Sequence, residues 1–172
     1  MAPRRPPDAS SLGPPLDLLR HLWQLNHALE RMSSQMRQRL GVTAQQRLFV
    51  RCIGKYPGIT AAELSALLHL DPGTVSVGLA RLARKGLVTR RRDDRDQRRV
   101  ALRLTPAGRR LNHPDRATVE FVVQRVISRE SAADLKRTKR LLEQLAVALL
   151  QQLETSAARR SPRAARLTSP RS

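Results

Sequence analysis

Apolar and polar positions repeat most regularly across residues 59–108. Thr60, followed three residues later by Glu63, has the form of a capping box, in which each side chain bonds the backbone N–H of the other residue. The leucines that follow recur at helical spacing and share one face: Leu64, Leu67 and Leu68. The pattern predicts a short helix that starts just after Thr60.

A second helix start lies a few residues further on. Asp71 is a favourable N-cap, and Pro72 fits the first helical position, where its missing N–H costs nothing. The inward positions recur at i, i+4 and i+7: Val75, Leu79 and Leu82. The positions left facing outward are Gly73, Ser76, Val77, Ala80, Arg81 and Arg84. Gly86 is the residue type that ends a helix in a left-handed conformation.

Two strands are predicted next, over residues 87–92 and 98–105. In the second strand, Val100, Leu102 and Leu104 alternate with Arg99, Ala101 and Arg103, which is the period of a strand with one buried face. Residues 93–98 between them are too charged to bury and are predicted to form a loop. Two short helices followed by a charged hairpin indicate a winged helix-turn-helix. In that fold the second helix enters a DNA major groove, and the hairpin reaches the neighbouring minor groove.

Longer helices are predicted on the N-terminal side of this core. The first runs from residue 16 to Gly41, with apolar residues every three or four positions: Leu18, Leu22, Leu25, Leu29, Met32, Met36 and Leu40. Thr43 and Gln46 have capping-box form and begin another helix, which Pro57 and Gly58 end. The inner face predicted for that helix consists of Leu48, Phe49, Cys52, Ile53 and Tyr56.

On the C-terminal side, Thr105 and Pro106 mark the start of a helix that Pro114 interrupts, because proline removes a helical hydrogen bond. A helix resumes through the apolar residues Phe121, Val122, Val126 and Ile127. Ser131 can cap a last helix, whose apolar stripe keeps near-heptad spacing: Leu135, Leu142, Leu145, Leu149 and Leu153.

The fold class that follows is mainly α with a small β-hairpin wing (α+β). We expect a disordered arm over residues 1–15, a winged-helix DNA-binding domain over 42–105, and a disordered basic tail over 155–172. Residues 16–41 and 106–154 carry more apolar surface than a lone winged helix needs, so we predict that they are dimerisation helices. The alternative is that both apolar stripes pack within one chain.

The amino-acid composition indicates which kind of partner the chain binds. A formal charge of +19 indicates a polyanion, and arginine clusters around the predicted hairpin, which the bias of a GC-rich genome alone does not explain. An aromatic content of 2% argues against single-strand binding by base stacking. With one cysteine, the chain can form no intrachain disulfide and no zinc site whose four ligands are thiolates. Neither a membrane-spanning run nor a signal segment is evident, so we expect a cytoplasmic protein with no membrane partner.

The wing resembles that of the MarR family of bacterial transcription regulators. The family pattern Asp-x-Arg-Asp-x-Arg, followed by a strand and Leu-Thr-Pro-x-Gly, is matched by Asp93, Arg95, Asp96 and Arg98 and then by residues 104–108. Residues 73–76 and 85–88 also resemble the family, and the resemblance covers about residues 42–111. Val77 departs from it, because many relatives carry a basic residue there. The resemblance implies a dimer that reads a pseudo-palindromic operator.

The DNA-binding residues follow from the helix and the wing. We assign the major groove to Gly73, Thr74, Ser76, Val77 and Arg81, and phosphates to Arg84 and Lys85. Arg95 and Arg98 are the minor-groove candidates. Asp96 would be repelled by phosphates, so we expect it to pair with a neighbouring arginine and hold the wing in shape. The alternative for the wing is a solvated charged loop.

The resemblance also implies an effector pocket between the dimer helices and the DNA-binding lobe, for a small aromatic or phenolic ligand. The candidate lining residues are His21, Trp23, His27, Arg31, Cys52, Tyr56 and His113. For each of these residues taken alone, a position in the core or in an interface is the simpler interpretation. His21 and His27 are spaced i, i+6 and do not share a helix face well, so a metal site built from them alone is not expected. No cofactor is expected either. Some relatives sense oxidants through a cysteine near the start of the first helix, where this chain has none, and a buried Cys52 would be inert.

The function predicted is that of a homodimeric, sequence-specific transcriptional repressor of MarR type, released from DNA by a small-molecule effector. The alternative is an architectural protein that binds DNA irrespective of sequence and has no effector. An enzyme is not expected, since the chain has no nucleophile elbow, phosphate-binding glycine loop or His-Glu zinc motif.

Overall fold

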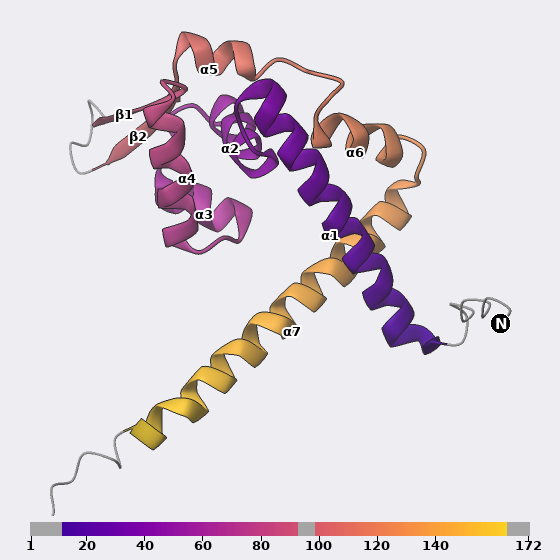
Figure 1. Ribbon diagram of the computed structural model, residues 1–172. Coiled ribbons are helices and arrows are strands. Elements are labelled where there is room, and N and C mark those ends of the chain that lie inside the picture. The colour runs from indigo at the N-terminus through magenta and orange to yellow at the C-terminus, as the bar shows by residue number, and fades with distance from the viewer. Residues whose placement is uncertain (1–11, 93–98, 165–172) are drawn as a thin grey trace, which may run out of the picture. The chain divides into compact units, whose positions relative to one another are not determined.

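The computed structural model describes the backbone of residues 12–92 and 99–164 and the side chains as far as residue 156 (Figure 1). The element order is α1 (Gly13–Leu40), α2 (Ala44–Lys55), α3 (Ala61–Leu68), α4 (Pro72–Arg84), β1 (Val88–Arg92), β2 (Val100–Leu104), α5 (Pro106–Leu111), α6 (Val119–Ile127) and α7 (Ala132–Ala164). The chain divides into two compact units, Met1–Val122 and Val123–Ser172. The mainly helical fold with a two-stranded hairpin confirms the predicted fold class.

Helix α1 begins at Gly13, three residues before the predicted start at residue 16. The two prolines that follow lie in the first turn, where a backbone N–H has no helical partner to lose, so they begin the helix rather than precede it. Gly41 ends α1 as predicted, with a φ of 72°. The arm predicted over residues 1–15 therefore overlaps the helix at residues 13–15, and residues 1–11 lie outside the described part of the chain.

Helix α2 passes through the centre of the first unit. Its predicted capping box is confirmed: the Gln46 N–H donates to Thr43 Oγ1, and the Thr43 N–H donates to Gln46 Oε1, both over 3.2 Å. The predicted inner face is wrong in part, because Leu48 and Tyr56 are exposed, whereas Val50 is fully buried. The helix is turned so that a charged residue, Arg47, takes a buried position that an apolar pattern cannot assign.

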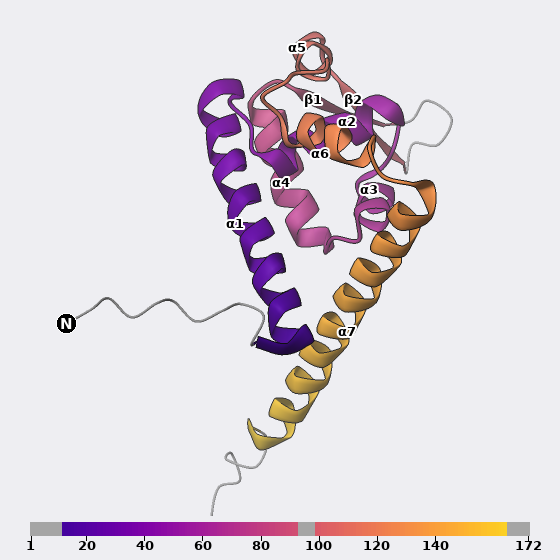
Figure 2. The ribbon, with the colours of Figure 1, turned by 90° about the vertical axis from the view of Figure 1, so that its right-hand side faces the viewer.

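Helices α3 and α4 form the helix-turn-helix, and they lie side by side below the hairpin (Figure 2). Both predicted N-caps are confirmed, with Thr60 accepting from the Glu63 N–H and Asp71 from the Thr74 N–H. On α3 only Leu64 is fully buried; Leu68 is partly buried and Leu67 is exposed, which corrects the predicted face. The core of the first unit is made by Val42, Phe49, Val50, Ile53, Ile59, Leu64, Val75, Leu79, Leu82, Val88 and Leu102.

Strands β1 and β2 pair antiparallel, with Val88 opposite Leu104 and Arg90 opposite Leu102. The predicted alternation along β2 is wrong at two positions, since Ala101 is buried and Val100 is exposed. The reason lies on the outer edge of β2, where Leu102 exchanges backbone hydrogen bonds with Gly58 (3.0 Å) and Ile59 (2.9 Å). This extra pairing covers the strand on a side that a free hairpin would expose.

Helix α5 packs closely on the base of the hairpin. The Thr105 hydroxyl accepts from the Gly108 N–H (3.0 Å) and donates to the Gly86 carbonyl (2.6 Å). A Cβ atom on Gly108 would lie 2.0 Å from the Leu87 carbonyl oxygen, so only glycine fits at this approach. The predicted break at Pro114 is confirmed: α5 ends at Leu111, and α6 begins at Val119 after a connector of irregular backbone.

The second unit consists of the end of α6 and the long helix α7. The Asp134 N–H donates to Ser131 Oγ over 3.1 Å, as predicted for the cap. The tail predicted to be disordered from residue 155 is helical as far as Ala164, and Thr155 and Ser156 bond back to the carbonyls of Gln151 and Gln152. None of the helices in the described residues is long and apolar enough to span a membrane.

Candidate nucleic-acid interface

The outward face of α4 is the first part of the candidate interface. Val75, Leu79 and Leu82 are fully buried, which fixes the rotation of the helix. The opposite side is therefore presented to solvent, and Val77 there keeps 52% of its surface exposed. The other exposed residues on this side are Gly73, Ser76, Ala80, Arg81 and Arg84, as the spacing of apolar residues predicts.

The first turn of α4 is held by its N-cap. Asp71 Oδ1 accepts from the Thr74 N–H over 2.8 Å, and Asp71 Oδ2 accepts from the Thr74 hydroxyl. These two hydrogen bonds from Thr74, the side-chain bond first, lower the pKa of the Asp71 carboxyl below its ordinary value. Thr74 is partly buried, and its hydroxyl proton is already donated within the protein, so it is a weaker candidate for a phosphate contact than the exposed Ser76.

A shallow hollow of about 280 Å³ lies between α4 and the start of α2. It is lined on one side by Thr43 and Gln45 and on the other by Thr74, Val77 and Arg81. The starts of α2 and α4 meet there. Their capping groups already accept the N–H groups of Gln46 and Thr74, so the group left to attract an anion is the exposed guanidinium of Arg81. Sequence patterns did not point to Gln45, because its place beside α4 depends on how α2 and α4 pack.

The two basic residues at the end of α4 have different surroundings. Arg84 is exposed. Lys85 is exposed as well, but its ammonium donates a hydrogen bond to the carbonyl oxygen of Gly41, at the end of α1. Lys85 therefore links the end of α4 to the end of α1, whereas the sequence alone pointed to a phosphate contact.

The hairpin extends the basic surface. Arg90, Arg91 and Arg92 on β1 are exposed, and Arg99 at the start of β2 donates through Nη2 to both Glu63 carboxylate oxygens, at 2.9 and 3.0 Å. The Thr60 N–H and then Arg99 lower the pKa of Glu63. The pair joins the start of β2, at the end of the hairpin away from α5, to α3. The wing candidates Arg95, Asp96 and Arg98 lie outside the described residues.

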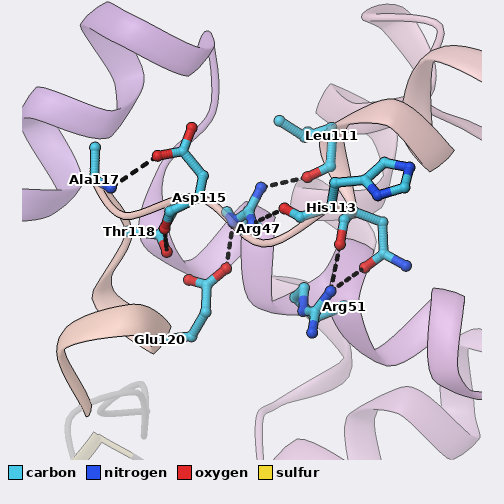
Figure 3. Close-up of polar contacts among 9 residues, drawn as sticks. Arg47, Arg51, Leu111, His113, Asp115, Ala117, Thr118 and Glu120 are labelled. Carbon is cyan, nitrogen blue, oxygen red and sulfur yellow. Dashed lines mark hydrogen bonds and ion pairs between the residues drawn. The ribbon is translucent and has the colours of Figure 1, made fainter. Parts of the chain in front are cut away.

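A cluster of polar contacts that the sequence did not predict is centred on two arginines of α2 (Figure 3). Arg47 is 1% exposed and donates to Glu120 Oε1, to the Leu111 carbonyl and, over 2.8 Å, to the His113 carbonyl. Arg51 donates to the carbonyl and the side-chain oxygen of Asn112, the latter over 3.0 Å. The signal in the sequence is two arginines spaced i, i+4 within an otherwise apolar helix, but nothing in the pattern identifies acceptors more than 60 residues away.

Comparison with known proteins places this arrangement in a family. The MarR family model matches residues 42–100, from the start of α2 to the start of β2. The chain is 30% identical over 106 residues to the HTH-type transcriptional repressor Mb2911 of Mycobacterium bovis, a match that covers 62% of this chain and 76% of that protein. The chain belongs to the MarR family. The family that the sequence indicated is confirmed.

Two solved structures resemble this MarR-family chain over most of their length. One is FabT of Streptococcus pneumoniae in complex with DNA, with a TM-score of 0.58 and 26% identity, covering 83% of this chain and 99% of that one. The other is the PcaV transcriptional regulator of Streptomyces coelicolor in complex with its natural ligand, with a TM-score of 0.59 and 26% identity, covering 85% and 97%. PcaV and Mb2911 are both named as transcriptional regulators or repressors.

The seven effector candidates of this MarR-family chain are spread over three segments. Those on α1 are exposed in the single chain, most of all Trp23 at 73%: the others are His21, His27 and Arg31. Tyr56 is exposed at the end of α2, and the His113 side chain is exposed in the connector. Cys52 packs against the core, and burial raises the pKa of its thiol, as the sequence predicted. The hollow beside α4 is lined by none of these residues.

Proposed function

We propose that this MarR-family chain is a homodimeric regulator that binds double-stranded DNA in a sequence-specific manner. The observation that carries the proposal is the exposed face of α4. Its first three turns present small, apolar and hydroxyl side chains, its last turn presents two arginines, and it borders a hollow at the start of α2. A helix presented in this way fits a major groove. The DNA complex of the similar protein FabT supports the assignment.

Within this interface we assign base contacts to exposed residues of α4, three in its first half and one in its last turn: Gly73, Ser76, Val77 and Arg81. Thr74 remains a candidate only if its hydroxyl turns away from Asp71. Arg84 is the phosphate contact, while Lys85 is bound to Gly41. Arg95 and Arg98 at the minor groove, with Asp96 supporting the wing, stay predictions.

The dimer rests on apolar surface that the single chain leaves uncovered. Exposed large residues on α1 include Leu18, Leu25 and Leu29, and Leu153 on α7 is 67% exposed. Exposed leucine stripes on two long helices are typical of an interface between subunits. We therefore keep residues 16–41 and 106–154 as the dimerisation segments, and 42–105 as the DNA-binding domain.

The test is selection of bound duplexes from a random DNA pool with the full chain at physiological salt. We expect an inverted repeat, with half-sites about one helical turn apart. The mass of the protein in solution, from light scattering, should be that of two chains. Recovery of sequences with no common motif would contradict the proposal, as would a monomeric mass.

We also propose that the regulator represses transcription and that a small aromatic or phenolic ligand releases it, acting in the cytoplasm where the operator lies. The similar protein Mb2911 is named a repressor, and PcaV was solved with its natural ligand. Deletion of the gene should raise transcription from the bound promoter, and an effector should lower operator affinity. A fall in transcription on deletion would show an activator instead.

One observation favours the architectural alternative: a charge of +19 suffices for strong binding to any duplex. Affinity that falls steeply with salt and is equal for all sequences would favour that function. A sequence preference that persists as salt is raised would favour the regulator.

A further inference from the structure

The strongest unexplained feature is the arginine cluster on α2, which takes no part in the candidate DNA interface. We infer that Arg47 and Arg51 form a clamp that positions the start of α6, and through it the DNA-binding lobe relative to the dimerisation helices. The clamp would then set the half-site spacing that the dimer accepts. This inference rests on the proposed function, since it concerns the same dimer and the same operator.

The clamp engages the end of α5. The last carbonyl groups of a helix have no partners within the helix, and cations are favoured beside them. Arg47 donates to the carbonyls of Leu111 and His113, and Arg51 donates to the carbonyl between them, that of Asn112. Two guanidinium groups thus hold three consecutive carbonyls, which fixes the backbone where α5 ends.

Close packing reinforces these hydrogen bonds. Gly54 lies seven residues after Arg47 and therefore on the same face of α2. A Cβ atom at Gly54 would lie 2.4 Å from the side-chain nitrogen of Asn112. The irregular segment between α5 and α6 therefore packs directly against the face of α2 that carries the two arginines. This segment has no room to shift toward α2.

The connector between the clamp and α6 is itself held by local bonds. Asp115 Oδ1 accepts from the Ala117 N–H over 2.7 Å, and the Thr118 hydroxyl donates to the Asp115 carbonyl over 2.6 Å. Thr118 is fully buried. Glu120, in the first turn of α6, then pairs with the same Arg47 that holds Leu111 and His113. One buried guanidinium therefore joins both ends of the connector.

The position of α6 matters because this helix runs on from the first unit into the second. In the proposed dimer, a change in the direction of α6 would move the whole DNA-binding lobe, and with it the recognition helix. Arg47 and Glu120 are thus positioning residues for operator binding, and neither belongs to the candidate DNA interface.

Glu120 is a better residue to substitute than Arg47, because the Glu120 side chain is 38% exposed whereas the Arg47 side chain is 2% exposed. Glu120→Ala deletes the contact from α6 and leaves the carbonyl contacts of Arg47 in place. Glu143→Ala removes another exposed carboxylate, from α7, and is the matched control. Glu120→Gln keeps an oxygen that accepts from Arg47 Nε and is the conservative variant.

The experiment measures the affinity of each protein for duplexes whose two half-sites lie at the preferred spacing or one base pair nearer or farther. We expect the wild type, Glu143→Ala and Glu120→Gln to prefer one spacing by about tenfold or more. Glu120→Ala should lose most of this preference while keeping its dimeric mass and its affinity for a single half-site. A wild-type spacing preference in Glu120→Ala would overturn the inference.

A second measurement needs no DNA. Spin labels on the exposed positions Ala62 and Gln144, introduced as cysteines with Cys52→Ser and diluted with unlabelled chains, report the distance between α3 and α7. Glu120→Ala should broaden the distance distribution relative to wild type and Glu143→Ala, and equal widths would overturn the clamp. If the wild type showed no preference for paired half-sites, the proposed function would fail, and the label distances would still decide on the clamp.

Discussion

Arg81 and Arg84 lie three residues apart on α4, yet only Arg81 borders the hollow beside the start of α2. Both side chains are exposed. Both belong to the last turn of α4, but Arg81 lies beside the hollow next to Val77, where we place it near base edges, whereas Arg84, the final residue of the helix, is placed to reach the phosphate backbone. Substituting each arginine in turn therefore distinguishes contacts to bases, which give sequence specificity, from contacts to phosphates, which give affinity for any DNA.

We predict that Arg81→Ala lowers the preference for operator over random DNA by about 5- to 150-fold, equivalent to about 1–3 kcal/mol. Arg84→Ala should instead weaken binding to both DNAs alike and reduce the slope of log affinity against log salt by about one. Fluorescence anisotropy titrations over a range of salt concentrations measure both effects. The assignment is wrong if Arg84→Ala changes the preference and Arg81→Ala does not.

The single residue Cys52 offers a second test. Burial raises the pKa of its thiol, and nearby Lys55 opposes this effect only in part. At neutral pH the group is therefore protonated to a greater extent than an ordinary thiol and is a poor nucleophile.

Iodoacetamide at pH 7 should react more slowly with Cys52 in the native protein than in the same protein unfolded in urea, as followed by mass spectrometry. Peroxide should leave DNA binding of the wild type and of Cys52→Ser equally unaffected. Release of DNA from the wild type alone would show that the thiol is a sensor after all.

At the scale of the elements, the first turn of α4 is held by its N-cap residue, Asp71. Asp71 bonds both the backbone and the hydroxyl of Thr74, and these bonds favour the ionised carboxylate. A carboxyl whose pKa is lower in the folded state stabilises the fold above its unfolded-state pKa, near 3.8, and this contribution is lost as the pH falls through the folded-state pKa.

Asp71→Ala should therefore lower the melting temperature by a few degrees at pH 7, and the difference from wild type should shrink at acid pH. Asp71→Asn, which caps without titrating, should stay close to the wild type at pH 7 and gain on it at acid pH. Differential scanning calorimetry at several pH values gives the comparison. A difference between wild type and Asp71→Ala that is constant with pH would contradict the role of the charge.

The starts and ends of elements were the part of the fold that the sequence predicted best. Capping at Thr43, Thr60 and Asp71, and the helix end at Gly41, depend on residues next to one another in the chain. The buried faces were harder to predict.

On α2 the pattern placed Leu48 inside and gave no place to Arg47, because the partners of Arg47 are the backbone carbonyls of a distant connector. On β2 the burial of Ala101 follows from pairing with residues 58–59, which an isolated hairpin pattern does not contain. Such errors arise wherever tertiary contacts, rather than local periodicity, decide which side of an element is covered.

At the scale of the whole molecule, three features converge on one account. Basic residues gather on the helix-turn-helix and the hairpin, exposed leucines line α1 and α7, and the clamp on α2 ties the connector before α6 to the DNA-binding lobe. A charge of +19 ensures affinity for DNA of any sequence, so affinity alone says little about function. Specificity is what distinguishes a regulator from an architectural protein.

The most direct test of this account compares binding of the full chain to the intergenic DNA upstream of its own gene with binding to random DNA of equal length, at physiological salt. The account predicts a preference of about a thousandfold or more for the upstream fragment, with two protected segments related by two-fold symmetry. Equal affinity for both fragments, together with failure of the random-pool selection to yield a common motif, would contradict it. The charge, rather than the recognition helix, would then govern DNA binding.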